Sequence, residues 1–149
     1  MTNTSKRVVF RMIDPLAKPP TKSTLGSAGV DLRAIEGGRL APGERKLVRT
    51  GLKVDLPDGM VGDIRPRSGI AFKHGVTVLN APGTIDSDYE GELGVLLINL
   101  DPDEPFAWAA GDRVAQFVVL TLADAEFDGV DFAYNVERGA GGWGSTGVE

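Results

Sequence analysis

Short runs of residues with strand character, separated by glycine and proline, limit most strongly what this chain can fold into. Residues 7–13 and 60–66 each have the composition of a short strand, and residues 46–56 alternate apolar and polar side chains around a break at Gly51. Turn-forming residues, such as those at 37–38 and 57–59, lie between these runs. Helical periodicity is nearly absent, with one candidate helical turn at residues 68–73. The pattern predicts an all-β sandwich or barrel.

The length and charge of the chain indicate a single acidic domain. Its 149 residues suffice for one hydrophobic core, and its formal net charge is -5. That charge argues against binding to nucleic acid or to a membrane surface. The first residues are not followed by the apolar segment of a signal peptide, and no run is long enough to span a bilayer. We therefore expect a soluble, cytoplasmic protein.

The absence of cysteine and the single histidine, His74, narrow the chemistry open to the chain. Disulfides, thiolate nucleophiles and Cys-type metal sites are excluded, and so is a His-rich zinc site. A Ser-His-Asp triad would have to use His74. Acid–base chemistry therefore falls mainly to carboxylates, with tyrosine or lysine as lesser options.

The stretch from Asn80 to Gly91 combines turn-forming residues with acidic side chains and one tyrosine, Tyr89. It precedes residues 95–100, which have the apolar composition of a buried strand. We therefore predict a tight hairpin that presents a general base and a ligand pocket. Taken alone, the stretch is explained more simply as an acidic, solvated turn.

A second stretch is basic, although the chain as a whole is acidic. Arg65, Arg67 and Lys73 occur together with no acidic residue among them. We expect Ser68 to cap the short helix that follows, so that arginine, hydroxyl and the Gly69 backbone form a phosphate cradle. The alternative is a capped turn with solvated arginines. Ser68 is not expected to be a nucleophile, because no base stands beside it in the sequence.

Two polar residues stand out on predicted strands. From Val30 onward apolar and charged residues alternate, which places Asp31 and Arg33 on one face of a short strand. Such an aspartate usually belongs to a solvated face, and a metal or ligand role is the minority interpretation. Gln116 lies near the start of a long, mostly apolar strand over residues 113–122, where it is either exposed at the strand end or buried with partners. Residues 124–136 form a last irregular section with short-strand character.

The last twelve residues, 138–149, contain too much glycine to build a core. Their glycine spacing matches a dinucleotide fingerprint and a phosphate loop, but no helix can follow and the phosphate-loop lysine is missing. A disordered tail is the simple interpretation. Arg138, Trp143, Ser145 and Thr146 would instead suit an arm that closes over a nucleotide and its phosphates.

Taken together, the chain resembles the trimeric, all-β deoxyuridine triphosphatases (dUTPases). Five motifs carry the resemblance in the family's order, at residues 28–34, 66–71, 83–91, 113–116 and 138–147. The resemblance implies a jelly-roll-like β-domain over residues 1–136 with a flexible glycine-rich C-terminal arm over 137–149. It also implies a homotrimer whose active sites are shared between subunits.

The implied activity is hydrolysis of dUTP to dUMP and pyrophosphate with Mg2+, which keeps uracil out of DNA and supplies dUMP for thymidylate synthesis. Asp86 would be the general base for attack of water on the α-phosphorus, and Asp31 would hold Mg2+ through water. Tyr89 would pack on the deoxyribose and exclude a 2′-hydroxyl. The remaining implied substrate contacts are Asn80, Gly83, Thr84 and Ile85 for uracil, Arg67, Ser68, Gly69 and Gln116 for phosphates, and Arg138, Trp143, Gly144, Ser145 and Thr146 from the arm.

Two positions depart from the family's pattern. Trp143 stands where phenylalanine is commonest, and Glu90 follows Tyr89 where arginine or glutamine is frequent. A dCTP deaminase of the same fold and a nucleotide-binding regulator without turnover are the competing interpretations. The deaminases resemble this chain less, because their general base is a glutamate in a third motif of different sequence. A regulator should have lost a catalytic element.

Overall fold

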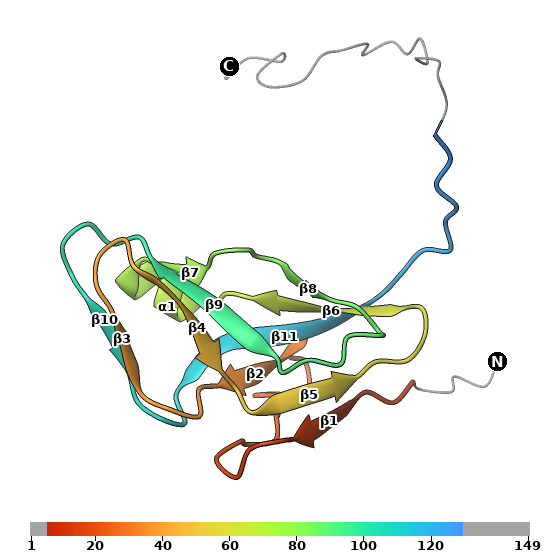
Figure 1. The fold of residues 1–149 in the computed structure, drawn as a ribbon, viewed down its shortest axis with the longest axis horizontal. Coiled ribbons are helices and arrows are strands. Elements are labelled where there is room, and N and C mark those ends of the chain that lie inside the picture. The colour runs from red at the N-terminus through yellow and green to blue at the C-terminus, as the bar shows by residue number, and fades with distance from the viewer. Residues whose placement is uncertain (1–5, 130–149) are drawn as a thin grey trace.

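A four-stranded antiparallel sheet forms one layer of the computed structural model, which describes residues 6–129 (Figure 1). Its strand order is β2-β11-β6-β8. The strands are β2 (Gly29–Arg33), β6 (Met60–Arg65), β8 (Gly83–Ile85) and β11 (Arg113–Thr121). The long strand β11 pairs with both β2 and β6, so it is the strand through which distant segments of the chain meet.

A three-stranded antiparallel sheet of order β4-β9-β7 and two strand pairs complete the fold. The sheet contains β4 (Arg45–Arg49), β7 (Val76–Val78) and β9 (Gly94–Asn99). The pairs are β1 (Val9–Met12) with β5 (Leu52–Asp55), and β3 (Gly38–Leu40) with β10 (Phe106–Trp108). The arrangement is a jelly-roll β-sandwich, as the sequence predicts. Within the described residues, no helix is long and apolar enough to cross a membrane.

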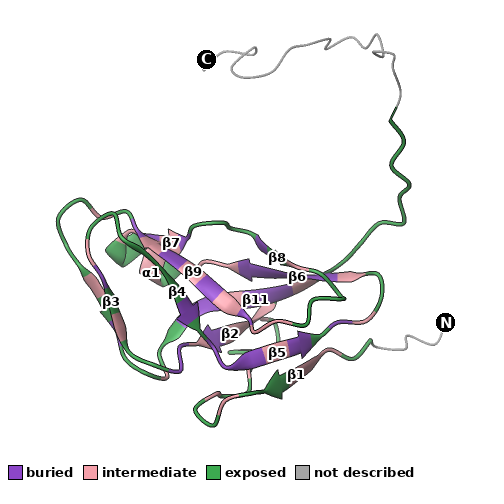
Figure 2. Ribbon diagram, viewed as in Figure 1, coloured by how far each residue is buried: buried purple, intermediate pink, exposed green. Residues whose placement is uncertain are grey.

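The core lies between the strands, and its buried residues run along β5, β6, β9 and β11 (Figure 2). Phe117 is its largest fully buried side chain, and its ring meets that of Phe10 edge-on at 5.5 Å between centroids. The same ring covers Gly62 on β6, where an added Cβ would overlap its atoms. Close packing of this kind fixes the register of β11 against β6.

Strand-like composition and, in places, alternation of apolar and polar residues predicted most strands correctly. The strands expected over residues 7–13, 60–66, 95–100 and 113–122 are β1, β6, β9 and β11. The expected break at Gly51 separates β4 from β5, and Gly51 has the left-handed φ of 66° that favours glycine. The helical turn is α1 (Ser68–His74), which ends at Gly75 in the αL conformation.

The prediction of a tight hairpin over Asn80–Gly91 is wrong. β8 pairs with β6, whereas β7 and β9 pair with each other in the other sheet. The chain therefore leaves one sheet after β7, pairs with the other sheet through β8 and returns to the first sheet at β9, so it reverses over a wide connection and no strands pair with each other within residues 80–91.

The β3–β10 pair was not predicted. Gly38 belongs to β3, although the sequence indicates a turn there, because the Trp108 ring occupies the space of a side chain at that position. Of the irregular section with short-strand character expected at residues 124–136, residues 124–129 form no strand and the others lie outside the described residues.

Packing of Phe117 on Gly62 predicts a large effect from one methyl group. We expect Gly62→Ala to lower the free energy of unfolding by about 1–3 kcal/mol, because the core is already full at this point. Urea denaturation measures it. Gly26→Ala is the matched control: nothing lies within 4 Å of its added Cβ, so it should be neutral or slightly stabilising. Equal stabilities of the two variants would contradict the packing argument.

Candidate functional site

The loop after β8 presents Asp86 and Tyr89 to solvent. Asp86 is exposed, and none of the described residues forms an ion pair with it. The Tyr89 N–H donates to the Asp86 carbonyl at 3.2 Å, which closes a turn and sets the two residues side by side. An unpaired carboxylate beside an aromatic ring is what the general-base prediction requires of this loop.

The residues predicted to bind the uracil ring lie on and before β8. Gly83 is buried, and a Cβ added there would come within 3.3 Å of the Asn80 amide nitrogen. Thr84 is exposed and Ile85 is half-buried. The structure therefore brings Asn80 against the backbone of Gly83, so that a side-chain amide and main-chain groups are offered together.

Asp31 is the centre of a cluster that joins three of the sequence motifs. Its carboxylate oxygens lie 3.3 Å from Arg67 Nε and 3.5 Å from Arg113 Nη1, and the Ser23 hydroxyl donates to it at 3.2 Å. Arg67 also donates to the Arg113 carbonyl at 3.1 Å. Gln116 lies opposite Asp31 in the β2–β11 register. The predicted phosphate and metal residues thus meet at one end of the four-stranded sheet.

Gln116 is half-buried with a partner, the second of the two alternatives open from the sequence. Its Nε2 donates to the Pro66 carbonyl at 3.0 Å. This bond holds the start of the basic stretch against β11.

The expected N-cap role of Ser68 is wrong. The N-cap position of α1 is Arg67, whose backbone is extended, and no side-chain hydrogen bond caps the helix. Ser68 is the first helical residue instead, and it is exposed together with Gly69. A Cβ added to Gly69 would meet nothing within 4 Å, so the backbone there is open to a ligand.

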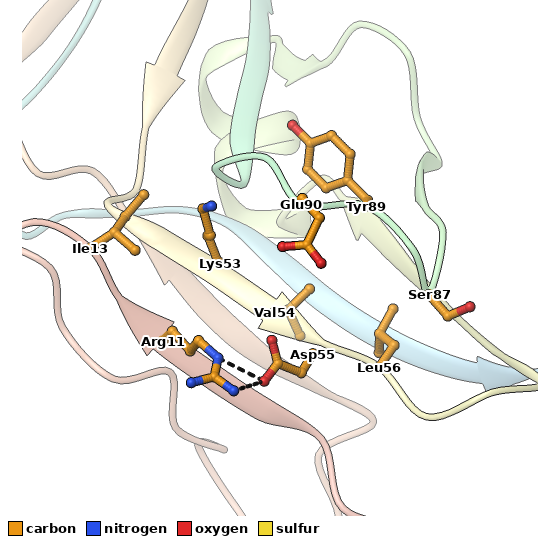
Figure 3. A pocket seen from close by; sticks show the side chains of 9 residues that line it. All are labelled: Arg11, Ile13, Lys53, Val54, Asp55, Leu56, Ser87, Tyr89 and Glu90. Carbon is orange, nitrogen blue, oxygen red and sulfur yellow. Dashed lines mark hydrogen bonds and ion pairs between the residues drawn. The ribbon is translucent and has the colours of Figure 1, made fainter.

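Within one protomer, the predicted site residues line two different cavities. Tyr89 lines a cavity of about 410 Å³ with Ser87 and Glu90 on the loop and with β1 and β5 opposite (Figure 3). Arg67 and Gly69 line another of about 400 Å³ between α1 and β10. Tyr89 and Arg67 thus line two different cavities.

A metal ion would find only a partial protein site here. Among residues 6–129, no three His, Cys, Asp or Glu side chains are grouped to hold one. Asp31 offers a single carboxylate, so further ligands would have to come from a bound molecule or from water.

Sequence reasoning missed Ser23 and the ion pairs of Arg113. Arg113 begins the fourth motif, but nothing in its local sequence marks Asp31 as its partner. The predicted arm residues Arg138, Trp143, Gly144, Ser145 and Thr146 lie outside the described residues, as does the domain boundary at 136/137.

Comparison with known proteins identifies the family. The dUTPase family model matches residues 16–147, and the chain belongs to the dUTPase family. The deoxyuridine 5'-triphosphate nucleotidohydrolase of Treponema denticola is 54% identical over 142 residues, which cover 94% of this chain and 98% of that protein. The protein of the same name from Cutibacterium acnes is 52% identical over 129 residues, covering 87% of this chain and 85% of that protein.

Solved structures agree with this assignment. The Staphylococcus bacteriophage 80alpha dUTPase with dUPNHPP is 26% identical, with a TM-score of 0.85 over 97% of this chain and 100% of that chain. A mutant dUTPase from phage phi11 of S. aureus, described with a structural Mg(II) ion, is 23% identical with a TM-score of 0.77. The match covers 85% of this chain and 97% of the phage protein, and it supports only the assignment of the fold.

The Asp31 ion pairs predict competition with anions. We expect Asp31→Asn to raise the affinity for inorganic pyrophosphate without metal by about threefold, because Arg67 and Arg113 lose an internal anion. Isothermal titration calorimetry in chelator at low salt measures this affinity. Asp55→Asn removes the same charge from a pair with Arg11 on another surface and should change little. Unchanged or weaker binding by Asp31→Asn would refute the competition.

Proposed function

We propose that this protein hydrolyses dUTP to dUMP and pyrophosphate, with Asp86 activating the water that attacks the α-phosphorus. The observation that carries the proposal is the meeting of Asp31, Arg67 and Gln116, from three separate motifs, at one end of a sheet. Membership of the dUTPase family supports the same reaction.

The proposed division of labour follows the chemistry of the side chains. Asp86 is exposed without a cation partner among residues 6–129, so its carboxylate is available to orient a water and accept its proton. Arg67 can bind phosphate oxygens through two parallel N–H groups, and the open backbone at Ser68 and Gly69 adds donors. Gln116 fixes the start of this stretch through Pro66.

Selection of the deoxyuridine group is assigned to the loop and β8. The Tyr89 ring would pack on the deoxyribose and leave no space for a 2′-hydroxyl. Asn80 and the backbone from Gly83 to Ile85, with Thr84 between them, would bind the uracil edge. Cytosine carries a donor where uracil carries an acceptor, so fixed backbone groups would reject it by leaving polar atoms unpaired.

Asp31 is the proposed magnesium-binding residue. A single carboxylate suits Mg2+, which keeps much of its hydration shell and takes further oxygens from a triphosphate. When bound, the ion would neutralise charge that develops on the phosphate oxygens. Asp31 would then exchange its arginine partners for the hydrated ion, which releases Arg67 toward the phosphates.

A complete site is proposed to need more than one subunit. Tyr89 and Arg67 line different cavities within one protomer, which favours a homotrimer in which one subunit supplies the loop and another supplies the cradle. Residues 137–149 are proposed as the arm that closes the site, with Trp143 stacked on uracil and Arg138, Gly144, Ser145 and Thr146 at the phosphates. We further propose a cytoplasmic role in keeping uracil out of DNA and supplying dUMP for thymidylate synthesis.

Replacement of the base tests the mechanism. We expect Asp86→Asn to lower kcat for dUTP by about 10²–10⁴-fold and to leave substrate affinity nearly unchanged, because the amide cannot accept the proton. Single-turnover pyrophosphate release and equilibrium binding measure the two quantities.

Asp88→Asn provides the control, since it makes the same charge change on the same exposed loop. It should retain wild-type turnover. Normal turnover by Asp86→Asn would show that the base has been wrongly assigned.

A further inference from the structure

The Tyr89 ring is held in one place by two contacts within its own loop. Its hydroxyl donates to the Glu92 carbonyl at 3.0 Å. The ring also covers Gly91, where an added Cβ would overlap the hydroxyl oxygen and the ring carbons. The position of the Glu92 carbonyl therefore decides where the phenol can rest.

The side chain of Glu92 ties that carbonyl to the bend between β4 and β5. One carboxylate oxygen accepts from the Gly51 N–H at 2.7 Å, and the other accepts from Arg49 Nε at 3.2 Å. A Cβ on Gly51 would come within 2.9 Å of the Asp14 and Ala17 side chains, so the bend is rigidly packed. The hydrogen bond that Arg49 donates to the Glu92 carboxylate raises the pKa of Arg49, as expected for a charged partner.

The next residue is tied to the same bend through the backbone. Leu93 donates to the Leu52 carbonyl at 2.7 Å and accepts from the fully buried Thr50 hydroxyl at 2.6 Å. The Leu93 N–H and the Glu92 carbonyl belong to one planar peptide group, so the backbone bond at Leu93 and the Glu92 carboxylate hold this carbonyl from two sides. The Glu92 carboxylate is the link nearest Tyr89 that a substitution can remove without disturbing the core.

We propose that Glu92 is a positioning residue that determines the selectivity for deoxyribose over ribose by fixing the Tyr89 ring against Gly91. The inference rests on the proposed function, in which Tyr89 excludes the 2′-hydroxyl. Without the Glu92 carboxylate, the Glu92 carbonyl keeps only the backbone anchor at Leu93, its position becomes less defined, and the Tyr89 phenol is held less firmly against Gly91. The space that opens admits a ribonucleotide.

The kinetic test compares kcat/KM for dUTP with kcat/KM for UTP. Glu92→Ala should lower this ratio by about tenfold, the equivalent of one hydrogen bond in a water-poor site. Glu92→Gln, which keeps an acceptor for Gly51 but loses the charge facing Arg49, should lower it by about threefold and serves if the alanine variant does not fold. Tyr89→Phe should lower it like Glu92→Ala, because it removes the other end of the bond.

Glu44→Ala is the matched control, because it also removes a glutamate carboxylate that accepts a hydrogen bond from a backbone N–H. Glu44 accepts from the Ala41 N–H at 2.7 Å in the turn before β4, away from the Tyr89 loop. Its removal should leave the ratio unchanged. A ratio within twofold of wild type for both Glu92 variants overturns the proposal. If Glu92→Ala lowers the ratio but Tyr89→Phe keeps the wild-type ratio, Glu92 does not act through the hydrogen bond of the Tyr89 hydroxyl.

A readout without substrate separates this inference from the proposed function. The full-length chain has two tyrosines, Tyr89 and Tyr134, so 3-fluorotyrosine labelling gives two 19F resonances that Tyr134→Phe assigns. The Tyr89 resonance should shift in Glu92→Ala and stay in place in Glu44→Ala. An unshifted Tyr89 resonance overturns the positioning role. A shift in an enzyme that hydrolyses neither nucleotide would uphold the positioning role and overturn the proposed function instead.

Discussion

The register of β11 is the constraint on which the fold and the site both depend. Phe117 enters the core over Gly62, which leaves Gln116 on the opposite side of the strand, across from Asp31 on β2. A slip of one residue would exchange these two faces and place a glutamine amide in the core. The energy that fixes the register is therefore apolar burial, although the groups that it positions are polar.

A local irregularity in β11 adjusts this register at the site. Pairing with β2 shifts between Arg113 and Ala115, so that the consecutive residues Val114 and Ala115 are both buried. Bulges of this kind redirect side chains where a regular strand could not. Arg113 consequently reaches Asp31 and completes, with Arg67, a cationic pair around one carboxylate. The Asp31 carboxylate therefore offsets part of the positive charge that Arg67 and Arg113 would present to phosphates.

The loop that carries Asp86 and Tyr89 depends on different contacts. β8 anchors its start to β6, whereas Glu92 and Leu93 anchor its end to the bend between β4 and β5. Asp86, the proposed general base, and Tyr89, the residue proposed to contact the deoxyribose, are therefore held between the two sheets. Each half of the proposed site is anchored by its own contacts, and we propose that neighbouring subunits bring the two halves together on one substrate.

Sequence patterns predicted β4 and β5 from alternation and β11 from its long, mostly apolar run. The three-residue strands β3 and β10 were missed because they are too short to show a period, and Gly38 owes its place to a tryptophan seventy residues away. The motifs identified Asp31, Arg67 and Gln116 individually. The ion pairs of Asp31 with Arg67 and Arg113 depend on how β2, β11 and the start of α1 meet in space, which no local pattern encodes. Ser68 was misplaced by one position because a serine before a helix suits either the cap or the first turn.

Pyrophosphate release from dUTP, dTTP, dCTP and UTP, each with Mg2+ and then with chelator, tests the central claim most directly. We expect pyrophosphate release from dUTP alone. Chelation should abolish this release, and dCTP should yield no ammonia. Comparable release from several of these nucleotides would contradict the assigned selectivity of the Tyr89 loop. Release from none of them would contradict dUTP hydrolysis itself and favour a nucleotide-binding regulator.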